Sequence, residues 1–236
     1  MNPPAPPAVW PAGNFKQVSI TIAPDPAPPS DAAADRRWAE LLAEKPRLFD
    51  GPILSVQSLA LDRGLISCRR DTYKRLAVQP EVPTGANLLS VSGVLTALDS
   101  RGREHTLLGR RGRQTRIYGN MWELAPSGGV DAPPPGQRQV SWHGLMAQLQ
   151  AELLSETGLA DTLQNAEFLA AVRDPVAFST DLVIRARLSP TIDRLKPART
   201  NWEYSELLWL PLADLPRVAA SEPTIATTRA LIPLLG

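Results

Sequence analysis

Residues 148–159 have the sequence Gln-Leu-Gln-Ala-Glu-Leu-Leu-Ser-Glu-Thr-Gly-Leu, and more can be inferred from them than from any other part of the chain. They predict the last turns of a helix that ends at Gly158, because glycine readily adopts the left-handed conformation common at helix ends. Glu152 and Glu156 are four positions apart, so their carboxylates lie one helical turn apart on the same face.

The apolar residues of this predicted helix place both acids at the edge of a hydrophobic stripe. The stripe consists of Trp142, Leu145, Met146, Leu149 and Leu153. Two carboxylates at such an edge repel each other and lose hydration, and a bound cation would relieve both costs. The alternative is that both acids are solvated, as charged residues on helices usually are.

A second informative segment lies upstream of the helix. Residues 121–131 have the sequence Met-Trp-Glu-Leu-Ala-Pro-Ser-Gly-Gly-Val-Asp. Trp-Glu-Leu-x-Pro-x-Gly-Gly, followed by a helix that ends Glu-Leu-x-x-Glu-Thr-Gly-Leu, resembles the Nudix hydrolase family. In that family the helix of the Nudix box holds magnesium against a substrate diphosphate. The resemblance therefore implies that Glu152 and Glu156 are both catalytic and metal-binding residues.

The box of this chain departs from the family pattern, which is a Gly, a loop and then Arg-Glu-aliphatic-x-Glu-Glu-x-Gly-aliphatic. Ala151 stands where the family has Arg, and Ser155 stands where it has the first Glu of the Glu-Glu pair. The loop from Asp131 to Val140 is longer than usual and contains no Glu. Glu152 and Glu156 are the two box acids that remain, so the site is one carboxylate short.

The overall composition narrows the kinds of site. The chain has 236 residues, a formal net charge of +1, one cysteine and two histidines. One cysteine excludes an internal disulfide, and so few sulfur and imidazole ligands disfavour a zinc site. A metal is therefore expected to have oxygen ligands and to be magnesium, with manganese as the alternative. The near-neutral charge predicts neither a nucleic-acid nor a membrane partner, and the resemblance implies a small-molecule nucleotide as the partner.

The distribution of apolar residues predicts a cytoplasmic location. No apolar run approaches the roughly 20 residues that a bilayer-spanning helix needs. The start, Met1 to Pro7, has neither the basic nor the apolar region of a signal peptide.

Proline content and hydrophobic periodicity divide the chain into three parts: a proline-rich segment at 1–17, expected to be extended or loosely held, an N-terminal extension at 18–87, and a Nudix-like domain at 88–236. In the extension we expect strands at 18–22, 53–61 and 65–68, a helix at 31–44, and a short helical stretch at 69–76.

In the third part, strands are expected at 88–98, 104–111, 166–172, 179–188 and 203–210. Helices are expected at 141–157, from 211 and at 224–235. This order suits an α/β fold, in which a mixed sheet lies between helices. The resemblance makes it a Nudix-type α/β/α sandwich that carries an N-terminal α+β extension.

A second resemblance concerns the extension. Trp38, the segment Pro46-Arg47-Leu48-Phe49-Asp50 and the segment Cys68-Arg69-Arg70-Asp71-Thr72-Tyr73 look like the UDP-glucose diphosphatase subgroup of Nudix enzymes. Members of that subgroup similarly carry an extension, a lengthened box loop and an irregular box.

Further candidates surround the box. The backbone of Gly128 and Gly129 lacks a Cβ and can approach a substrate closely, so both are predicted to bind it. Arg110 and Arg111 end a predicted strand and could bind a diphosphate, but alternation along a strand lets at most one point inward. The candidates for a further acidic ligand are Asp174, Asp181, Glu203 and Glu206, and the sequence does not rank them.

Other residues are expected to be structural. Trp122 is expected to pack in the core, although it could stack on a base. His143 has no second metal-ligating neighbour, and Cys68 has no partner that would make it reactive.

The function implied by the resemblance is magnesium-dependent hydrolysis of a nucleoside diphosphate linked to another group, with UDP-glucose as one candidate. The products would be a nucleoside monophosphate and a sugar phosphate. The alternative is an impaired Nudix-like domain that binds a nucleotide or a protein partner, which Ala151 and Ser155 favour and the retained acids oppose. The resemblance also allows a homodimer.

Overall fold

The computed structural model describes residues 5–24, 26–29, 31–79, 81–198 and 201–236. The fold is built around β5 (Leu88–Leu98), whose interior residues are all buried. Burial on both faces is typical of a central strand that is covered by other elements on each side. Among the described residues, no helix is long and apolar enough to cross a membrane.

β5 has different partners along its two edges. One edge pairs in parallel with β11 (Ser179–Leu188) over most of its length. The other edge pairs antiparallel with β3 (Pro52–Ala60), then with β8 (Ser127–Gly129) and then with β6 (Glu104–Arg111). The sheet is therefore mixed, and the Gly-Gly segment lies directly beside its central strand.

The sheet continues on both sides of this centre. β11 pairs with β10 (Leu163–Asp174), and β10 pairs with β1 (Ala8–Pro11). β6 pairs with β7 (Trp122–Leu124) and β12 (Tyr204–Pro211). β1 shows that residues 8–11 of the proline-rich start take the extended alternative of the prediction, because their backbone pairs with β10.

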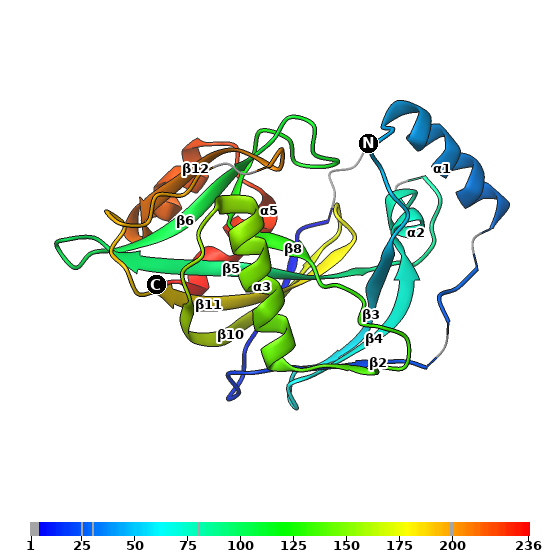
Figure 1. The fold of residues 1–236 in the computed structure, drawn as a ribbon, viewed down its shortest axis with the longest axis horizontal. Coiled ribbons are helices and arrows are strands. Elements are labelled where there is room, and N and C mark those ends of the chain that lie inside the picture. Colours follow the sequence, from blue (N-terminus) through cyan, green and yellow to red (C-terminus); the bar gives the residue numbers. More distant parts are fainter. Residues whose placement is uncertain (1–4, 25, 30, 80, 199–200) are drawn as a thin grey trace.

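Helices cover both faces of the sheet (Figure 1). α3 (Trp142–Thr157) packs on the face that contains Leu182 and Ile184 of β11, whereas Val183 points to the opposite face. That second face is covered by α4 (Leu215–Ser221) and α5 (Ala226–Leu231), with short 3₁₀ turns at Leu212–Asp214 and Ile232–Leu234. The α/β/α fold class predicted from the sequence is confirmed.

The helix that carries the box begins and ends as its sequence predicts. The Ser141 hydroxyl accepts a hydrogen bond from the Gly144 amide at 3.2 Å, which caps the first turn. Gly158 ends the helix with φ = 72°, and its amide donates to the Leu154 carbonyl at 3.0 Å. Leu145, Leu149 and Leu153 are fully buried, so the predicted apolar stripe fixes the rotation of the helix.

The N-terminal extension belongs to the same sheet. β3 pairs with β4 (Leu65–Thr72), and β4 pairs with β2 (Ser19–Ile22). β2 in turn pairs with β9 (Gln139–Val140), which lies in the lengthened loop before α3. The long box loop thus has a structural partner, because it docks on the extension. Arg70 of β4 strengthens the contact by donating to the Pro134 carbonyl at 2.9 Å.

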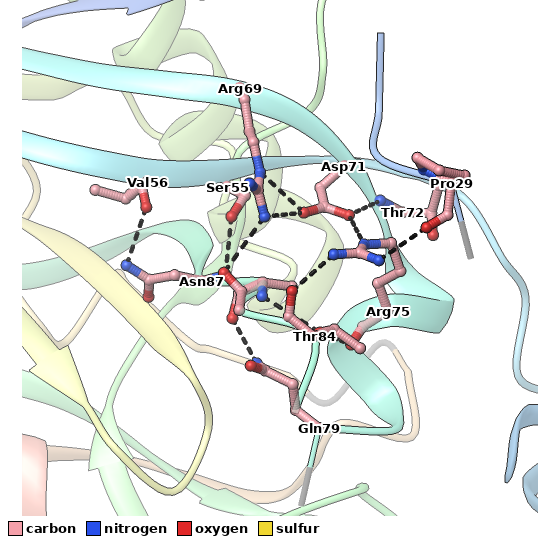
Figure 2. A network of polar contacts seen from close by, with 12 residues as sticks. Pro29, Ser55, Val56, Arg69, Asp71, Thr72, Arg75, Gln79, Thr84 and Asn87 are labelled. Atoms are coloured by element: carbon pink, nitrogen blue, oxygen red, sulfur yellow. Dashed lines mark hydrogen bonds and ion pairs between the residues drawn. The ribbon is translucent and has the colours of Figure 1, made fainter. Parts of the chain in front are cut away.

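A polar network joins the extension to the start of β5 (Figure 2). The buried Asp71 carboxylate pairs with Arg69 at 3.0 Å and with Arg75 at 2.9 Å. Arg75 also donates to the Thr84 carbonyl at 2.7 Å. The Ser55 hydroxyl accepts from the Asn87 amide at 2.9 Å, one residue before β5. These contacts give the Arg-Arg-Asp-Thr-Tyr segment a structural role, because they fix α2 (Tyr73–Ala77) against the core.

Several boundaries differ from the prediction. The charged stretch 69–76 was expected to be helical, but β4 continues through Thr72 before α2 begins. Pairing with β3 and the buried Asp71 anchor extend the strand, which local sequence cannot show. The helix at 31–44 is α1 (Ala32–Glu44), capped by Asp31, whose carboxylate accepts from the Ala34 amide at 2.7 Å. The three domain boundaries stay a prediction.

Candidate active site

The candidate site is a cavity of about 270 Å³ at the centre of the sheet. β8 contributes Gly128 and Gly129 to its wall, and β5 and β11 contribute Ser90 and Asp181. The lining also includes residues 115–118, in the link between β6 and β7, and Trp202 and Glu203, which precede β12. Since β8 lies against both β5 and α3, the cavity adjoins the two box acids.

Glu156 is the most buried acid of the box, with 2% of its surface exposed. Its carboxylate accepts a hydrogen bond from the Ser127 amide at 3.2 Å. Burial, followed by the neighbouring Glu203 carboxylate, raises the pKa of Glu156 to about 10. Glu123 and Glu152 add negative charge in the same direction. Without a cation, this side chain therefore retains its proton at neutral pH.

Glu152 lies one turn earlier on α3 and is half-buried. The Gln148 side-chain amide donates to its carboxylate at 2.8 Å. Burial raises the pKa of Glu152, and Glu203 and Asp131 contribute to the rise. The carboxylate lies directly over Gly128, where any Cβ would overlap it. Glu152 can therefore take this position only if residue 128 is glycine. A Cβ at Gly129 would make ordinary van der Waals contacts.

Glu203 is a third acid that lies close to both box glutamates. It precedes β12, and its backbone amide donates to the Asn201 side chain at 2.8 Å. The Asn201 amide donates in turn to the Ser155 carbonyl at 3.2 Å, which ties this loop to the end of α3. Of the four sequence candidates for a further ligand, Glu203 is the one that faces Glu156.

The other three candidates are placed elsewhere. Glu206 is exposed on β12 and lies 3.9 Å from Arg110. Asp174 and Asp181 line another part of the same cavity. The Tyr118 hydroxyl donates to both oxygens of Asp174, at 2.9 and 2.8 Å. Burial, together with the negative charges of Asp174 and Glu123, raises the pKa of Asp181 to about 7.

The paired arginines point in different directions, as strand alternation predicts. Arg111 lines the cavity and pairs with the buried Glu123 at 2.6 Å. The Tyr204 hydroxyl donates to the same Glu123 oxygen at 2.9 Å. Arg110 points away and donates to the Asn120 carbonyl at 3.3 Å. Of the two arginines, only Arg111 lines the cavity; Arg110 as a substrate-binding residue stays a prediction.

The charges of the site fit a divalent cation. Among the described residues, neither lysine nor arginine forms an ion pair with Glu152, Glu156 or Glu203. The raised pKa values show that the ionised carboxylates are costly here without a counter-charge. No three acidic, histidine or cysteine side chains of the described part of the chain form a ready-made metal cluster. A cation would therefore draw the carboxylates together and complete its coordination with water.

No protein-family model and no curated protein matches this chain. The solved structures that it resembles are Nudix and MutT proteins. They include the MutT protein from Methanosarcina mazei Go1, with 19% identity over 63% of this chain and 92% of that chain and a TM-score of 0.46. The NUDIX domain of Shewanella oneidensis NrtR, complexed with ADP ribose, has 21% identity over 66% and 93%, with a TM-score of 0.47.

A NUDIX hydrolase from Alicyclobacillus acidocaldarius matches with 12% identity over 63% of this chain and 90% of that chain, at a TM-score of 0.48. Each of the three TM-scores is below one half. The resemblance to UDP-glucose diphosphatases stays a prediction.

Sequence reasoning missed the residues that support the acids. Glu123 belongs to the quoted Trp-Glu-Leu segment, yet only the fold shows its pair with Arg111 and Tyr204.

Trp122 is 7% exposed and packs in the core, which confirms the expectation for this residue. His143 is exposed, and Cys68 is fully buried. Burial raises the pKa of the Cys68 thiol to about 12, so it is unreactive.

Proposed function

We propose that this chain is a divalent-cation-dependent hydrolase of the Nudix type. Its substrate would be a nucleoside diphosphate linked to another group, and a UDP-sugar such as UDP-glucose is the specific candidate. The observation that carries the proposal is the arrangement of Glu152, Glu156 and Glu203, which crowd together beside a glycine strand and form no ion pair with a lysine or arginine in the described part of the chain.

The reaction breaks one P–O–P bond of the diphosphate. A water oxygen bonds to phosphorus, the bridging oxygen leaves with the other phosphate, and the proton of water passes to solvent. The products are two phosphate monoesters, here a nucleoside monophosphate and a sugar phosphate. Magnesium, or manganese, would neutralise charge on the phosphate oxygens when bound, because hard cations prefer oxygen ligands.

The residues of the chain supply binding and orientation. Glu152, Glu156 and Glu203 would hold the cation. The Ser127 amide and the Gln148 side chain fix two of these carboxylates in place. Accurate positioning of reactants accounts for a large part of catalysis in phosphoryl transfer.

Other residues that line the cavity favour the same substrate class. Gly129 leaves room for a phosphate close to the backbone of β8, whereas the space over Gly128 is occupied by Glu152. Arg111 adds positive charge to the wall, and its pair with Glu123 holds the guanidinium at a defined place. A planar guanidinium can donate two parallel hydrogen bonds to a phosphate.

The second candidate function is nucleotide binding without turnover. Two observations favour it. Within the described residues, no three potential ligands form a ready-made metal cluster. In addition, the exposed Ser155 stands at a position where the box has an acid. Such a domain would bind the diphosphate through its cavity wall. Its affinity would then not depend on a cation.

A turnover assay distinguishes the two candidates. Phosphate-ester release would be measured from a panel of nucleoside diphosphate sugars, ADP-ribose and dinucleoside polyphosphates, with and without magnesium. Wild type would be compared with Glu152→Gln and with Glu206→Gln, a control on the exposed face of β12. We expect magnesium-dependent turnover that only Glu152→Gln abolishes. Nucleotide binding without turnover in wild type would support the second candidate.

A further inference from the structure

A second cavity of about 580 Å³ adjoins the candidate active site. One wall is formed by residues 44–48, at the end of α1, and the other by residues 113–116, which link β6 to β7. Four residues line both cavities, namely Tyr73, Thr115, Arg116 and Trp202. A ligand that occupies the first cavity can therefore extend into the second.

The second cavity is strongly basic. Its lining includes four cationic side chains, Lys45, Arg47, Arg113 and Arg116, and a single acid, Glu44. The Glu44 carboxylate already lies 3.6 Å from Arg37, which is outside the cavity. Over the described residues, none of the four cations forms an ion pair. Lys45, Arg47 and Arg113 are exposed, so their charges are accessible to an anion from solution.

The wall formed by residues 113–116 is held in place by the fold. The buried Thr115 hydroxyl lies 2.9 Å from the Gly112 carbonyl and 3.0 Å from the Ile117 carbonyl. Arg116 donates to the Ala177 carbonyl at 3.4 Å. Tyr73 also lines the cavity, and its ring packs edge to face on Trp38 of α1 with centroids 6.3 Å apart. This part of the cavity is therefore formed without a ligand, which lowers the entropy cost of binding.

We propose that this cavity binds a phosphate group of the substrate that is additional to the two phosphates of the hydrolysed diphosphate. The proposal rests on the function proposed above and narrows its substrate class to compounds with a third phosphate, which UDP-glucose lacks. Such a group is either a further phosphate in a polyphosphate chain or a phosphate monoester on the sugar or nucleoside. Trp202, which is 54% exposed between the cavities, offers a ring face on which a base can stack.

Charge and geometry favour a phosphate over other anions. A phosphate monoester carries nearly two negative charges at neutral pH, whereas a carboxylate carries one. Three of the four cations are arginines, whose planar guanidinium matches a phosphate with two parallel hydrogen bonds. The N-terminal extension then has a function in the proposed activity, because it supplies Lys45 and Arg47.

The test compares the dissociation constants of ligand pairs that differ by one phosphate. One pair is a nucleoside diphosphate and its triphosphate, and the other is ADP-ribose and its 2′-phosphorylated form. Binding is measured by calorimetry without a divalent cation, so it does not depend on turnover. The proteins are wild type, the double variant Arg47→Gln/Arg113→Gln and the control Arg101→Gln, an exposed arginine in the turn between β5 and β6.

We expect wild type and the control to bind one phosphorylated ligand at least about tenfold more tightly than its partner, because charge-assisted contacts contribute that much. The double variant should lose this preference and still bind the shorter ligand as wild type does. The preferred pair identifies the source of the phosphate. Equal affinities within both pairs for wild type, or an unchanged preference in the double variant, would overturn the inference. Failure of turnover with this preference intact would refute only the proposed hydrolysis.

Discussion

Replacement of Glu156 by glutamine should stabilise the metal-free protein, although it removes a residue proposed to be essential. The pKa of Glu156 is raised from 4.5 to about 10 in the folded protein by burial and by Glu203. As pH rises above 4.5, the unfolded chain loses this proton first, so stability falls with pH until about 10. Glutamine removes this penalty and retains an oxygen that can accept from the Ser127 amide.

The pH dependence of the free energy of unfolding gives the size of this effect. One pKa unit corresponds to about 1.4 kcal/mol, so the destabilisation by Glu156 grows by at most this amount per pH unit. Urea unfolding in a chelating buffer at several pH values between 5 and 9 would measure it. The free energy of unfolding of Glu156→Gln should exceed that of wild type by an amount that increases with pH. A variant that is less stable at every pH, or a difference that does not change with pH, would refute this account of the site.

Three further predictions concern single residues. Gly128→Ala should lower magnesium-dependent turnover by about 10–100-fold, because its Cβ would displace the neighbouring carboxylate of α3; turnover equal to that of wild type would contradict the place assigned to Glu152. Arg111→Met should lower the free energy of unfolding by about 3 kcal/mol, since it leaves the buried Glu123 unpaired; a denaturant midpoint equal to that of wild type would contradict this. The Cys68 thiol should react with a thiol reagent only after unfolding, because it is buried; rapid labelling of the native protein would count against the fold near β4.

Local sequence was sufficient to predict the elements that depend on local signals. Ser141 and Gly158 mark the two ends of α3, since both act through hydrogen bonds within a few residues. The burial of Leu145, Leu149 and Leu153 followed from helical periodicity. The α/β/α fold class could be derived because the order of strands and helices restricts how layers can pack.

Long-range contacts account for what the sequence did not show. The role of Glu203 depends on a loop that returns to the end of α3 from 46 positions away in sequence, through Asn201 and Ser155. The docking of the long box loop on β2 depends on backbone pairing, which carries no local signature. Neither the crowding of Glu203 with Glu156 nor the basic cavity could therefore be predicted from spacing or composition.

The missing box features also have a structural context. Ala151 and Ser155 lie on the outer surface of α3, and both are exposed. The family acid replaced by Ser155 would therefore lie at the rim of the site, whereas Glu156 lies deep within it. Glu203 supplies a carboxylate from another element of the fold, so the site retains three acids despite the irregular box.

Direct measurement of divalent cation binding tests the central proposal, that Glu152, Glu156 and Glu203 together hold a metal. Manganese binding would be followed by electron paramagnetic resonance, which separates free from bound ion, in wild type, Glu203→Gln and Glu206→Gln. The proposal predicts saturable binding by wild type and Glu206→Gln and a dissociation constant raised at least about tenfold in Glu203→Gln. Equal binding by all three proteins, or none by wild type with nucleotide present, would contradict it.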